Sequence, residues 1–408
     1  MNVLTSPGLA ATDFELVERK GSGHPDTLAD GVAEAISRSY STWCLDRFGA
    51  ILHHNTDKTA LLGGAADVRF GHGQMTAPVH VMVNGRITPG LGDVDIPVED
   101  IVTRAVHDYF AAALPLLDPA WLGVRTRLST AASPGAVTGP TSGQDAGRAY
   151  WFRPRTLDDL AERHRLFAND TSAGVGYAPA GTAERVAVDV EAYLGSEASR
   201  AAHPYLGTDT KLMVTTHGRR LHITACVPQI AAHTPDLDIY LARRDHVREI
   251  MAAAAAQSAP GHHVEVAVNT RDDAARCELY LTATGSSIES GDEGVVGRGN
   301  RANGVISMFR PWSAEGVSGK NPVYHVGKLY NLAAARVADA LHEETGRITA
   351  VALVSQSGRD LDDPRQVMVQ QSGTSPVDQT AVRRAVGAVM GDLDGLRSDL
   401  LAGKVTTA

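Results

Sequence analysis

The alternation of hydrophobic and polar positions predicts several short β-strands. Val79, Val81 and Val83 alternate with polar residues and predict a strand over 78–87. A mainly apolar run predicts a second strand over 51–62. Later candidates for strands are 185–193, 221–228, 263–269, 278–284 and 348–355.

A different period, close to that of an α-helix, recurs between these strands. Helices are predicted over 27–47, 98–113, 243–257, 326–345 and 379–401. In the first of them Leu28, Val32 and Ile36 share one stripe, and Asp26 is placed to cap the helix. The strands cluster in pairs without regular βαβ alternation, which favours the α+β class over a doubly wound parallel sheet. The chain has no G-x-G-x-x-G followed by an acidic residue, so a dinucleotide-binding fold is not supported.

Length and composition are typical of a globular protein. The 408 residues suggest two or three domains, at about 150 residues per domain. With 43% apolar and 21% charged residues, disorder and coiled coil are poor interpretations. Segment 129–144 has low hydrophobicity, and we interpret it as an insertion, a linker, a lid or a surface loop.

Charge and cysteine content limit the partners and the compartment. The net charge of −9 argues against bulk binding to nucleic acid or to an anionic membrane. Cys44, Cys226 and Cys277 form no CxxC pair, which fits reduced thiols rather than a zinc site or a disulfide framework. We find no signal peptide and no apolar run long enough to span a membrane. We therefore expect a soluble cytoplasmic protein.

Two polar stretches lie in the first sixty residues. In 21–30, GSGHPDTLAD, His24 and Asp26 open a helix whose N-terminus suits a phosphate chain, although they could be only a turn residue and a cap. In 53–58, HHNTDK, the adjacent His53 and His54 point to opposite faces of a strand and are poor joint metal ligands. Asp57, with its neighbour Lys58, is the better polar candidate there.

Two further stretches lie in the middle of the chain. Asp170 begins the Gly-rich turn NDTSAGVGY over 169–177. Asp209 and Lys211 are alternate residues in GTDTKLM and would share one strand face, where a surface salt bridge is the simpler explanation.

The most informative stretch runs from residue 289 to residue 328. Only Glu315 opposes its five basic residues after position 297, which are Arg298, Arg301, Arg310, Lys320 and Lys328. Asp292 and Glu293 lie just upstream between glycines. Acidic residues can hold Mg²⁺ while Arg and Lys neutralise phosphate oxygens, so a magnesium–polyphosphate site is predicted, with a solvated charged loop as the alternative. The segment GVSGKN is not a Walker A loop.

Taken in order, these stretches resemble the S-adenosylmethionine synthetases (methionine adenosyltransferases) of the archaeal type. The resemblance rests on ERKGSGHPDTLADGVAEAIS, ILHHNTDK, FANDTSAGVGYAP, GTDTKLM, GDEGVVGRGNRANG, SGKNPVYHVGKLYN and the terminal GKVTT. It covers nearly the whole chain except 1–11 and 129–164.

The resemblance implies three similar α+β domains around a pseudo-threefold axis. We expect an N-terminal domain over 13–128, a variable loop over 129–164, a central domain over 165–285 and a C-terminal domain over 286–408, with some interleaving of the chain. It also implies a homodimer, or a tetramer of two such dimers, with active sites at the subunit interface. The implied substrates are ATP and L-methionine, and the implied ions are Mg²⁺ and K⁺.

The resemblance also implies roles for individual residues. His24 would stabilise the leaving oxygen, and Asp26, Asp292 and Glu293 would bind Mg²⁺. The polyphosphate would be neutralised by Lys211, Arg298 and Lys320, with Lys328 as a fourth residue. Asp170 would hold the methionine amino group or the ribose, and Asp209 would lie beside Lys211 in the nucleotide site. Glu18 and Asp57 would lie near the potassium ion or the adenosine.

The sequence departs from the family pattern at three places. The Gly-Gln-Gly-Ser nucleotide loop is absent, Glu293 replaces a usual aspartate, and Tyr324 stands where asparagine is usual. A methionine analogue as substrate is therefore an alternative, as is a polyphosphate hydrolase or a non-catalytic nucleotide-binding or subunit-interaction protein. The retained His24, Lys211 and Lys320 argue against a non-catalytic scaffold.

Overall fold

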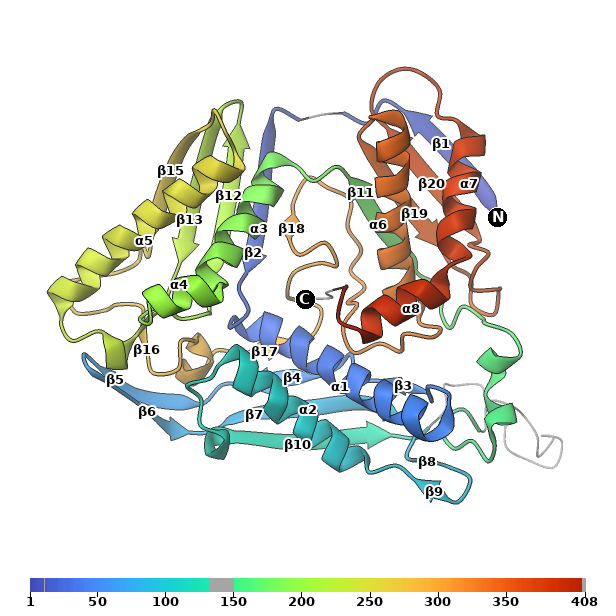
Figure 1. The fold of residues 1–408 in the computed structure, drawn as a ribbon, viewed down its shortest axis with the longest axis horizontal. Helices are drawn as coiled ribbons and strands as arrows, with labels where there is room; N and C mark the ends of the chain where they lie inside the picture. Colours follow the sequence, from blue (N-terminus) through green and yellow to red (C-terminus); the bar gives the residue numbers. More distant parts are fainter. Residues whose placement is uncertain (11, 132–149, 406–408) are drawn as a thin grey trace.

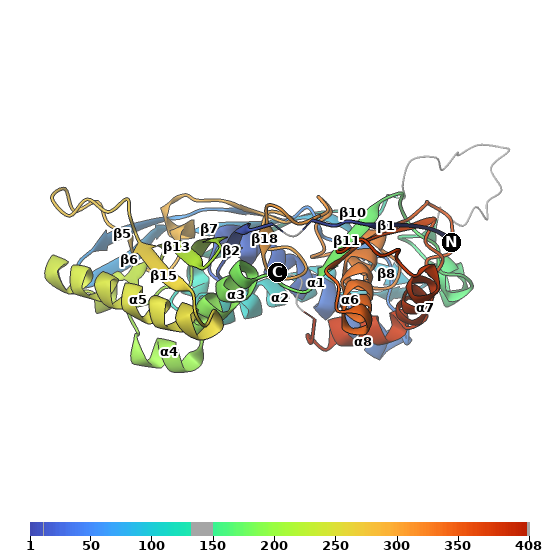
Figure 2. The ribbon, with the colours of Figure 1, turned by 90° about the horizontal axis from the view of Figure 1, so that it is seen from above.

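Three β-sheets, each covered by helices, surround the centre of the molecule (Figure 1). The computed structural model describes residues 1–10, 12–131 and 150–405, so most of the segment 129–144 lies outside the described residues. Seen from above, the helices lie mainly on one side and the strands on the other (Figure 2). This architecture confirms the expected α+β class. Within the described ranges, no helix is long and apolar enough to cross a membrane.

The first unit is built around a sheet with the strand order β10-β7-β4-β17, to which β3 adds by pairing with β7. Its strands are β3 (His54–Asn55), β4 (Ala60–Leu62), β7 (Val79–Ile87), β10 (Leu122–Ser129) and β17 (Gly294–Val295). Its helices are α1 (Pro25–Phe48) and α2 (Val98–Ala113). The predicted stripe of Leu28, Val32 and Ile36 on α1 is buried in one apolar core with Val79 and Val81 of β7.

The second unit has the strand order β15-β13-β12-β2-β18. Its strands are β2 (Phe14–Lys20), β12 (Lys211–His217), β13 (Arg220–Cys226), β15 (His263–Val268) and β18 (Ile306–Ser307). Its helices are α3 (Thr182–Gly195), α4 (Glu197–Ala202) and α5 (Leu237–Ser258). Apolar residues of these strands and helices form a separate core.

The third unit has the strand order β1-β20-β19-β11. Its strands are β1 (Asn2–Pro7), β11 (Ala173–Ala178), β19 (Thr349–Val354) and β20 (Gln366–Gln371). Its helices are α6 (Val326–Thr345), α7 (Gln379–Met390) and α8 (Leu393–Leu401), and they enclose a third core.

The same pairing pattern occurs in all three units. A helix is followed by two antiparallel strands, a second helix and a strand that pairs in parallel: α1-β4-β7-α2-β10, α3-β12-β13-α5-β15 and α6-β19-β20-α7 completed by β1. Each sheet also receives an antiparallel strand from elsewhere in the chain, namely β17, β2 or β11, and the second sheet receives β18 as well, through β2. The three units are therefore similar, and each sheet contains strands far apart in sequence. The boundaries expected at 13–128, 165–285 and 286–408 stay a prediction.

Short elements connect the units. Two-stranded ribbons are formed by β5 (Ala65–Arg69) with β6 (His72–Ala77), β8 (Gly90–Leu91) with β9 (Val94–Asp95), and β14 (Gln229–Ile230) with β16 (Leu281–Thr282). Single 3-10 turns span Pro119–Trp121, Leu157–Asp159, Ala161–Arg163, Ala231–His233 and Ser287–Ser290.

Most predicted elements are confirmed, although the strand predicted over 51–62 is divided into β3 and β4, and three other details differ. The predicted strand over 185–193 lies within helix α3, because Ala183, Val186 and Val190 follow helical spacing and pack into the core. The cap of α1 is His24 rather than Asp26, because Pro25 occupies the first helical position. The predicted helix over 379–401 is interrupted after Met390 and continues as α8.

A buried ion pair joins the first unit to the third. Lys328 on α6 is fully buried, and its ammonium nitrogen lies 2.7 Å from both carboxylate oxygens of Glu34 on α1. Glu34 also accepts a hydrogen bond from the Gly319 N–H. Burial lowers the pKa of Lys328, while the Glu34 charge opposes that shift. The pair therefore fixes the relative position of the two helices.

Glu34→Gln should destabilise the protein by about 3–5 kcal/mol, because it leaves the Lys328 charge buried without a counter-charge. Adding Lys328→Met removes that charge and should restore most of the lost stability. Urea unfolding of the wild type, the single variant and the double variant measures both effects. A double variant less stable than Glu34→Gln would contradict this explanation.

Candidate active site

The N-terminus of α1 is held against the start of β12 by close backbone contacts. The N–H groups of Gly21 and Gly23 donate to the carbonyl oxygens of Thr210 and Thr208, at 2.7 and 3.0 Å. A Cβ atom at Gly23 would lie 2.2 Å from the Thr208 hydroxyl oxygen. Only glycine fits so close to the opposite backbone, which explains why glycine occurs at both 21 and 23. The close contact places His24 beside the residues that follow Thr208.

The hydrogen bonding of His24 fixes its tautomer. Its Nδ1 accepts a hydrogen bond from the Asp26 N–H at 3.2 Å, so that nitrogen carries no proton in the neutral ring. Burial lowers the pKa of His24, with nearby charges of both signs as smaller influences, and keeps the ring neutral at pH 7. The proton therefore lies on Nε2, which can donate to a ligand.

Asp209 joins the loop before β12 to the segment after β16. Its Oδ2 accepts hydrogen bonds from the N–H and hydroxyl of Ser287, at 2.8 and 2.5 Å. The Ser287 hydroxyl also lies 3.1 Å from Oδ2 of Asp292. Burial raises the pKa of Asp209, and the bonds from Ser287 oppose that shift. Ser287 connects the two acids, and the sequence carries no motif that identified it.

Lys20 and Glu18 lie beside these acids at the end of β2. The Lys20 ammonium is 2.8 Å from Oδ2 of Asp26 and 2.7 Å from the Arg298 carbonyl oxygen. Glu18 lies 3.4 Å from Lys211 and 3.7 Å from Lys20. We call His24, Asp26, Asp209, Lys211 and Asp292 the first cluster. Lys20 was not predicted as a site residue, and its burial beside Asp26 is visible only in the fold.

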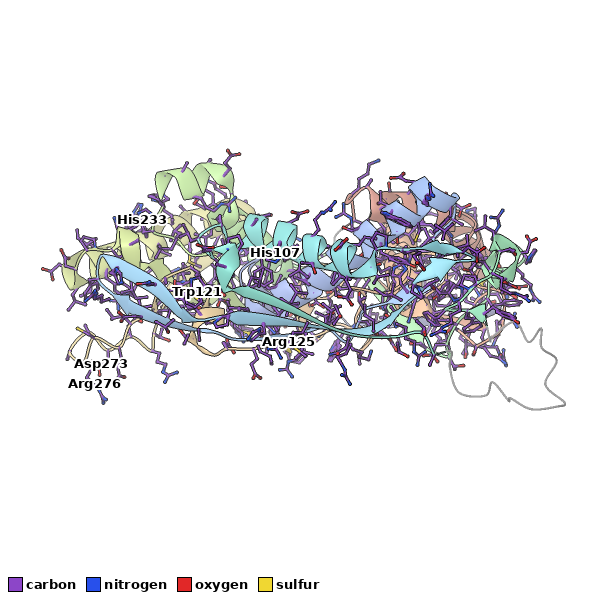
Figure 3. The ribbon with its side chains drawn as sticks, turned by 90° about the horizontal axis from the view of Figure 1, so that it is seen from below. His107, Trp121, Arg125, His233, Asp273 and Arg276 are labelled. Carbon is purple, nitrogen blue, oxygen red and sulfur yellow. The ribbon has the colours of Figure 1, made fainter. Side chains whose placement is uncertain are left out.

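Four members of the first cluster line an open cleft of about 680 Å³, namely His24, Asp209, Lys211 and Asp292. Tyr280 and Cys226 also line it, and the hairpin 269–280 forms one wall. Figure 3 shows this hairpin projecting beyond the strands on the side away from the helices, with Asp273 and Arg276 near its tip. The cleft is large enough for a nucleotide-sized ligand.

A buried carboxylate orders the segment that carries Asp292 and Arg298. Asp30 on α1 is 2% exposed, and its two oxygens accept hydrogen bonds from the N–H groups of Gly297 and Gly299, at 2.8 and 3.0 Å. Burial raises the pKa of Asp30 to about 7. Glycine is needed at 299, because a Cβ there would lie 2.3 Å from an Asp30 oxygen.

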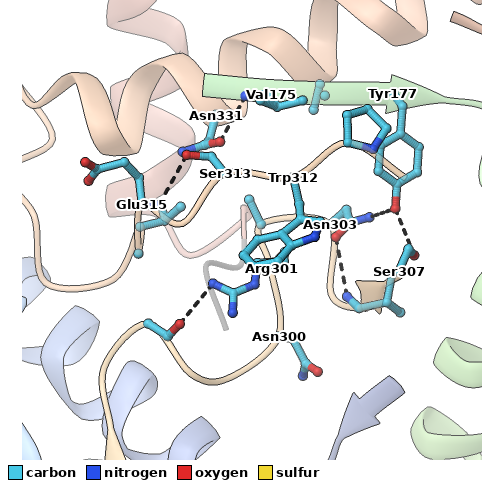
Figure 4. Close-up of a pocket in the computed structure, with 18 of the residues that line it drawn as sticks. Val175, Tyr177, Asn300, Arg301, Asn303, Ser307, Trp312, Ser313, Glu315 and Asn331 are labelled. Atoms are coloured by element: carbon cyan, nitrogen blue, oxygen red, sulfur yellow. Dashed lines mark hydrogen bonds between the residues drawn. The ribbon is translucent and has the colours of Figure 1, made fainter. Parts of the chain in front are cut away.

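The continuation of this segment packs into the centre of the molecule. Figure 4 shows a small pocket in which the Arg301 guanidinium and the Trp312 ring lie together, 5.2 Å apart. Arg301 donates to the Gly297 carbonyl at 2.9 Å, and Asn303 donates to the Tyr177 hydroxyl at 2.6 Å. Arg301 is therefore used to stabilise the loop in this structure.

A second cluster lies between β3 and the start of α6. Lys320 is 3% exposed, contacts Glu315 through a short ion pair and lies 3.9 Å from Asp57. Asp57 also pairs with Lys58 at 2.7 Å. Glu315 accepts a hydrogen bond from the Ser172 hydroxyl at 3.1 Å. We call Asp57, Glu315 and Lys320 the second cluster.

The other predicted site residues lie around these clusters. Asp170 is exposed, and its backbone carbonyl accepts a bond from Ser355, close to Ser172. Arg298 and Glu293 are exposed near the first cluster. Lys328 is buried against Glu34, so in this conformation its ammonium does not face solvent.

The acids predicted to bind Mg²⁺ differ in how far their carboxylate oxygens are already occupied by other partners. Asp26 already contacts Lys20 and the Val295 N–H. Asp292 and Glu293 are exposed, and from the described residues Asp292 accepts one bond at each oxygen, from Ser287 and from the Glu293 N–H. In the described ranges no group of three or more His, Cys, Asp or Glu residues could hold a metal alone. Mg²⁺ commonly uses one or two carboxylates together with substrate phosphates, so the Asp292–Glu293 oxygens fit such an ion.

Comparison with known proteins identifies the family. The sequence profile described as S-adenosylmethionine synthetase (AdoMet synthetase) matches residues 2–134 and 155–403. The chain belongs to the S-adenosylmethionine synthetase family. The S-adenosylmethionine synthase of Aeropyrum pernix is 36% identical over 416 residues, covering 98% of this chain and 97% of that protein. That of Pyrobaculum aerophilum is 39% identical over 362 residues, covering 87% and 86%.

A solved structure with lower sequence identity supports the same fold. The unusual S-adenosylmethionine synthetase from Campylobacter jejuni superposes with a TM-score of 0.60 and 15% sequence identity. The match covers 95% of this chain and 93% of that chain. The resemblance inferred from the motifs is therefore confirmed at the level of family and fold.

The raised pKa of Asp30 predicts a pH-dependent stability. Between about pH 4 and pH 7 the folded protein retains a proton that the unfolded chain releases. The free energy of unfolding should therefore fall as pH rises through this range, by at most about 1.4 kcal/mol per pH unit. Asp30→Asn removes this contribution, so the melting temperature of the wild type relative to the variant should fall between pH 5 and pH 8.

Thermal unfolding in half-unit pH steps measures the difference. Asp46→Asn, at an exposed position of the same helix, is the matched control and should parallel the wild type at every pH. Parallel curves for the wild type and Asp30→Asn would contradict the assignment.

Proposed function

We propose that this chain is a methionine adenosyltransferase that converts ATP, L-methionine and water to S-adenosylmethionine, phosphate and diphosphate. The observation that carries the proposal is the first cluster, in which a neutral histidine at a helix N-terminus faces the same cleft as two acids and a lysine. Family membership supports this assignment. The comparisons give no support to a methionine analogue as the main substrate, to a polyphosphate hydrolase or to a non-catalytic protein.

The reaction needs charge neutralisation more than a general base. A lone pair of the methionine sulfur forms the S–C5′ bond while the C5′–O bond breaks, and the triphosphate leaves with that electron pair. The thioether loses no proton in this step, because the product is a sulfonium ion. Water then cleaves the triphosphate to phosphate and diphosphate. The main demand is to stabilise the negative charge that develops on the leaving oxygen.

The first cluster is suited to that demand. The Nε2–H of His24 can donate to the leaving oxygen, and the N-terminus of α1 adds a positive dipole end. Lys211 and the exposed Arg298 would neutralise phosphate oxygens. Asp209 would position Ser287 and Lys211 rather than contact phosphate, because its carboxylate oxygens and the phosphate oxygens are both negatively charged and repel one another.

The ions would complete the neutralisation. Mg²⁺, held through Asp292, Glu293 and Asp26, would shield the triphosphate when bound. We propose that Glu18 or Asp57 lies near a K⁺ site or the adenosine, and that Asp170 holds the methionine amino group or the ribose. Lys320 would bind phosphate after its ion pair with Glu315 breaks. Lys328 could bind phosphate only after its ion pair with Glu34 breaks. We further propose a cytoplasmic location.

We also propose that two chains pair so that the first cluster of one meets the second cluster of the other. Exposed large apolar side chains lie in strands of all three sheets: Leu4, Phe14, Leu62, Val295 and Met368 are 42–46% exposed. Helices cover the opposite side of these sheets (Figure 2). A second copy would bury these side chains, and the projecting hairpin 269–280 would reach toward it. A tetramer of two such dimers is compatible with this arrangement.

Leu62→Glu should weaken the dimer, because it places a charge in the buried part of the proposed interface. Light scattering after gel filtration should show a shift from dimer to monomer, together with loss of S-adenosylmethionine formation. Ile239→Glu, at a 38% exposed position on α5, is the matched control and should leave both unchanged. A monomeric wild type with full turnover would exclude shared sites.

His24→Asn should lower kcat by about 100- to 1000-fold, because asparagine keeps the helix cap but removes the Nε2–H donor. The melting temperature should change little. The assay mixes protein, ATP, Mg²⁺, K⁺ and L-methionine, and detects S-adenosylmethionine by mass with phosphate and diphosphate alongside. His107→Asn on α2 serves as the control. Wild-type turnover in His24→Asn would refute the role of His24, and no product from the wild type would refute the proposed function.

A further inference from the structure

Two cationic side chains, Lys211 and Arg271, are among the described residues that line the cleft beside the first cluster. Lys211 lies 3.4 Å from Glu18, so part of its charge is already neutralised. Arg271 is exposed, and it forms no ion pair or hydrogen bond with the part of the chain that the structure describes. The charge of Arg271 is therefore available to a ligand in the cleft.

The residues on either side of Arg271 fix its backbone at the base of the hairpin. Asn269 is 5% exposed, and its side-chain amide donates to the Val227 carbonyl at 2.9 Å and accepts from the Val227 N–H at 2.8 Å. The Asp272 side chain is also 5% exposed, and it accepts a hydrogen bond at 2.8 Å from the hydroxyl of Tyr240, a buried residue of α5. Because both neighbours are tied to the second unit, the backbone holds Arg271 at the cleft and leaves only its side chain free to adapt.

The acids near Arg271 are occupied by other partners. Glu278, on the other arm of the hairpin, lies 2.8 Å from the guanidinium of Arg276, which is near the hairpin tip (Figure 3). Asp209 accepts the two hydrogen bonds from Ser287. An anion that enters the cleft would therefore meet a free cation on the hairpin side, opposed by little unpaired negative charge.

A polyphosphate is the anion that the proposed reaction brings to this cleft. Its leaving oxygen gains negative charge as the C5′–O bond breaks, and a guanidinium can bind two phosphate oxygens with parallel N–H donors. Lys320 must first separate from Glu315 to do the same, whereas Arg271 breaks no ion pair when it binds. Arg271 is thus the more readily available cation for the incoming nucleotide.

We propose that Arg271 binds the polyphosphate of the nucleotide and of the departing triphosphate, so that the hairpin 269–280 supplies a cation to the substrate site. This inference rests on the proposed adenosyl transfer. Arg271 adds its charge to that of Lys211 and to the Nε2–H donor of His24, which line the same cleft. Arg271 lies outside every stretch on which the family resemblance rests, so motif order did not mark it.

The test measures the dissociation constant of tripolyphosphate from the full-length protein by titration calorimetry with Mg²⁺, and the KM for ATP in the S-adenosylmethionine assay. Arg271→Gln should raise both constants by about 10-fold, because a charge-assisted contact is lost. Arg271→Lys should give intermediate values, because lysine keeps the charge but not the two-donor geometry. The dissociation constant of adenosine and the melting temperature should stay unchanged, since Arg271 has no such contact to lose in the free protein.

Arg219→Gln is the matched control, because it removes the same charge from the same unit. Arg219 is exposed on the turn between β12 and β13, whereas Lys211 begins β12 at the cleft. The six residues of strand between them span about 20 Å. Arg219→Gln should therefore leave the tripolyphosphate constant and the KM for ATP unchanged.

An unchanged tripolyphosphate constant in Arg271→Gln would overturn this inference. Equal effects of Arg271→Gln and Arg219→Gln would overturn it too, because they would report net charge rather than a contact. Weaker binding of adenosine with unchanged binding of tripolyphosphate would also overturn it, by assigning Arg271 to the base. A wild type that forms no S-adenosylmethionine would refute the proposed function, whereas the calorimetric comparison needs no turnover and still decides whether Arg271 binds polyphosphate.

Discussion

The hydrogen bonds from Gly297 and Gly299 to the Asp30 carboxylate determine where the acidic and cationic parts of the site can lie. A carboxylate this deeply buried is unfavourable unless donors compensate it, so the 297–299 backbone has one strongly preferred position on α1. In that position Asp292 precedes the two bonded glycines in the chain and Arg298 lies between them. Both residues are thereby held near the start of α1. Gly299 is required because a Cβ there would lie 2.3 Å from an Asp30 oxygen, and Gly297 is favoured because its φ is +87°.

Repetition of one pairing pattern produces two similar helix ends with different surroundings. α1 and α6 occupy equivalent places in their units, and each begins with a histidine whose Nδ1 accepts a bond from the second N–H of the helix, at 3.2 Å. His24 faces an open cleft, whereas His325 is 9% exposed and lies near Lys320 and Lys328. The same local cap therefore supplies a candidate donor at one helix and a buried packing residue at the other.

Sequence patterns predicted the individual elements better than their assembly. The stripe of Leu28, Val32 and Ile36 and the alternation of β7 report local periodicity, which neighbouring residues determine. Short strands such as β17 and β18 exist only because the 286–325 segment reaches distant sheets, and no local pattern marks them. Motif order identified the family, and most residues of the two clusters lie in those motifs. It could not reveal Lys20, Ser287 or Asp30, because each has an important partner far away in the chain. Ser287 is 78 residues from Asp209, Asp30 is 267 residues from Gly297, and Lys20 is 278 residues from Arg298.

The pairing of β1 with β20 has a consequence for synthesis on the ribosome. Asn2 lies opposite Gln366, so the strand that emerges first must wait for one of the last to appear. At about 5–20 residues per second, that delay is about 20–70 s. During this interval β1 has no partner, because β20 has not yet been made, and its unpaired backbone groups are a site for unwanted association. The first unit, whose strands and helices are mostly contiguous in the chain, can form its core much earlier and shield part of the nascent chain.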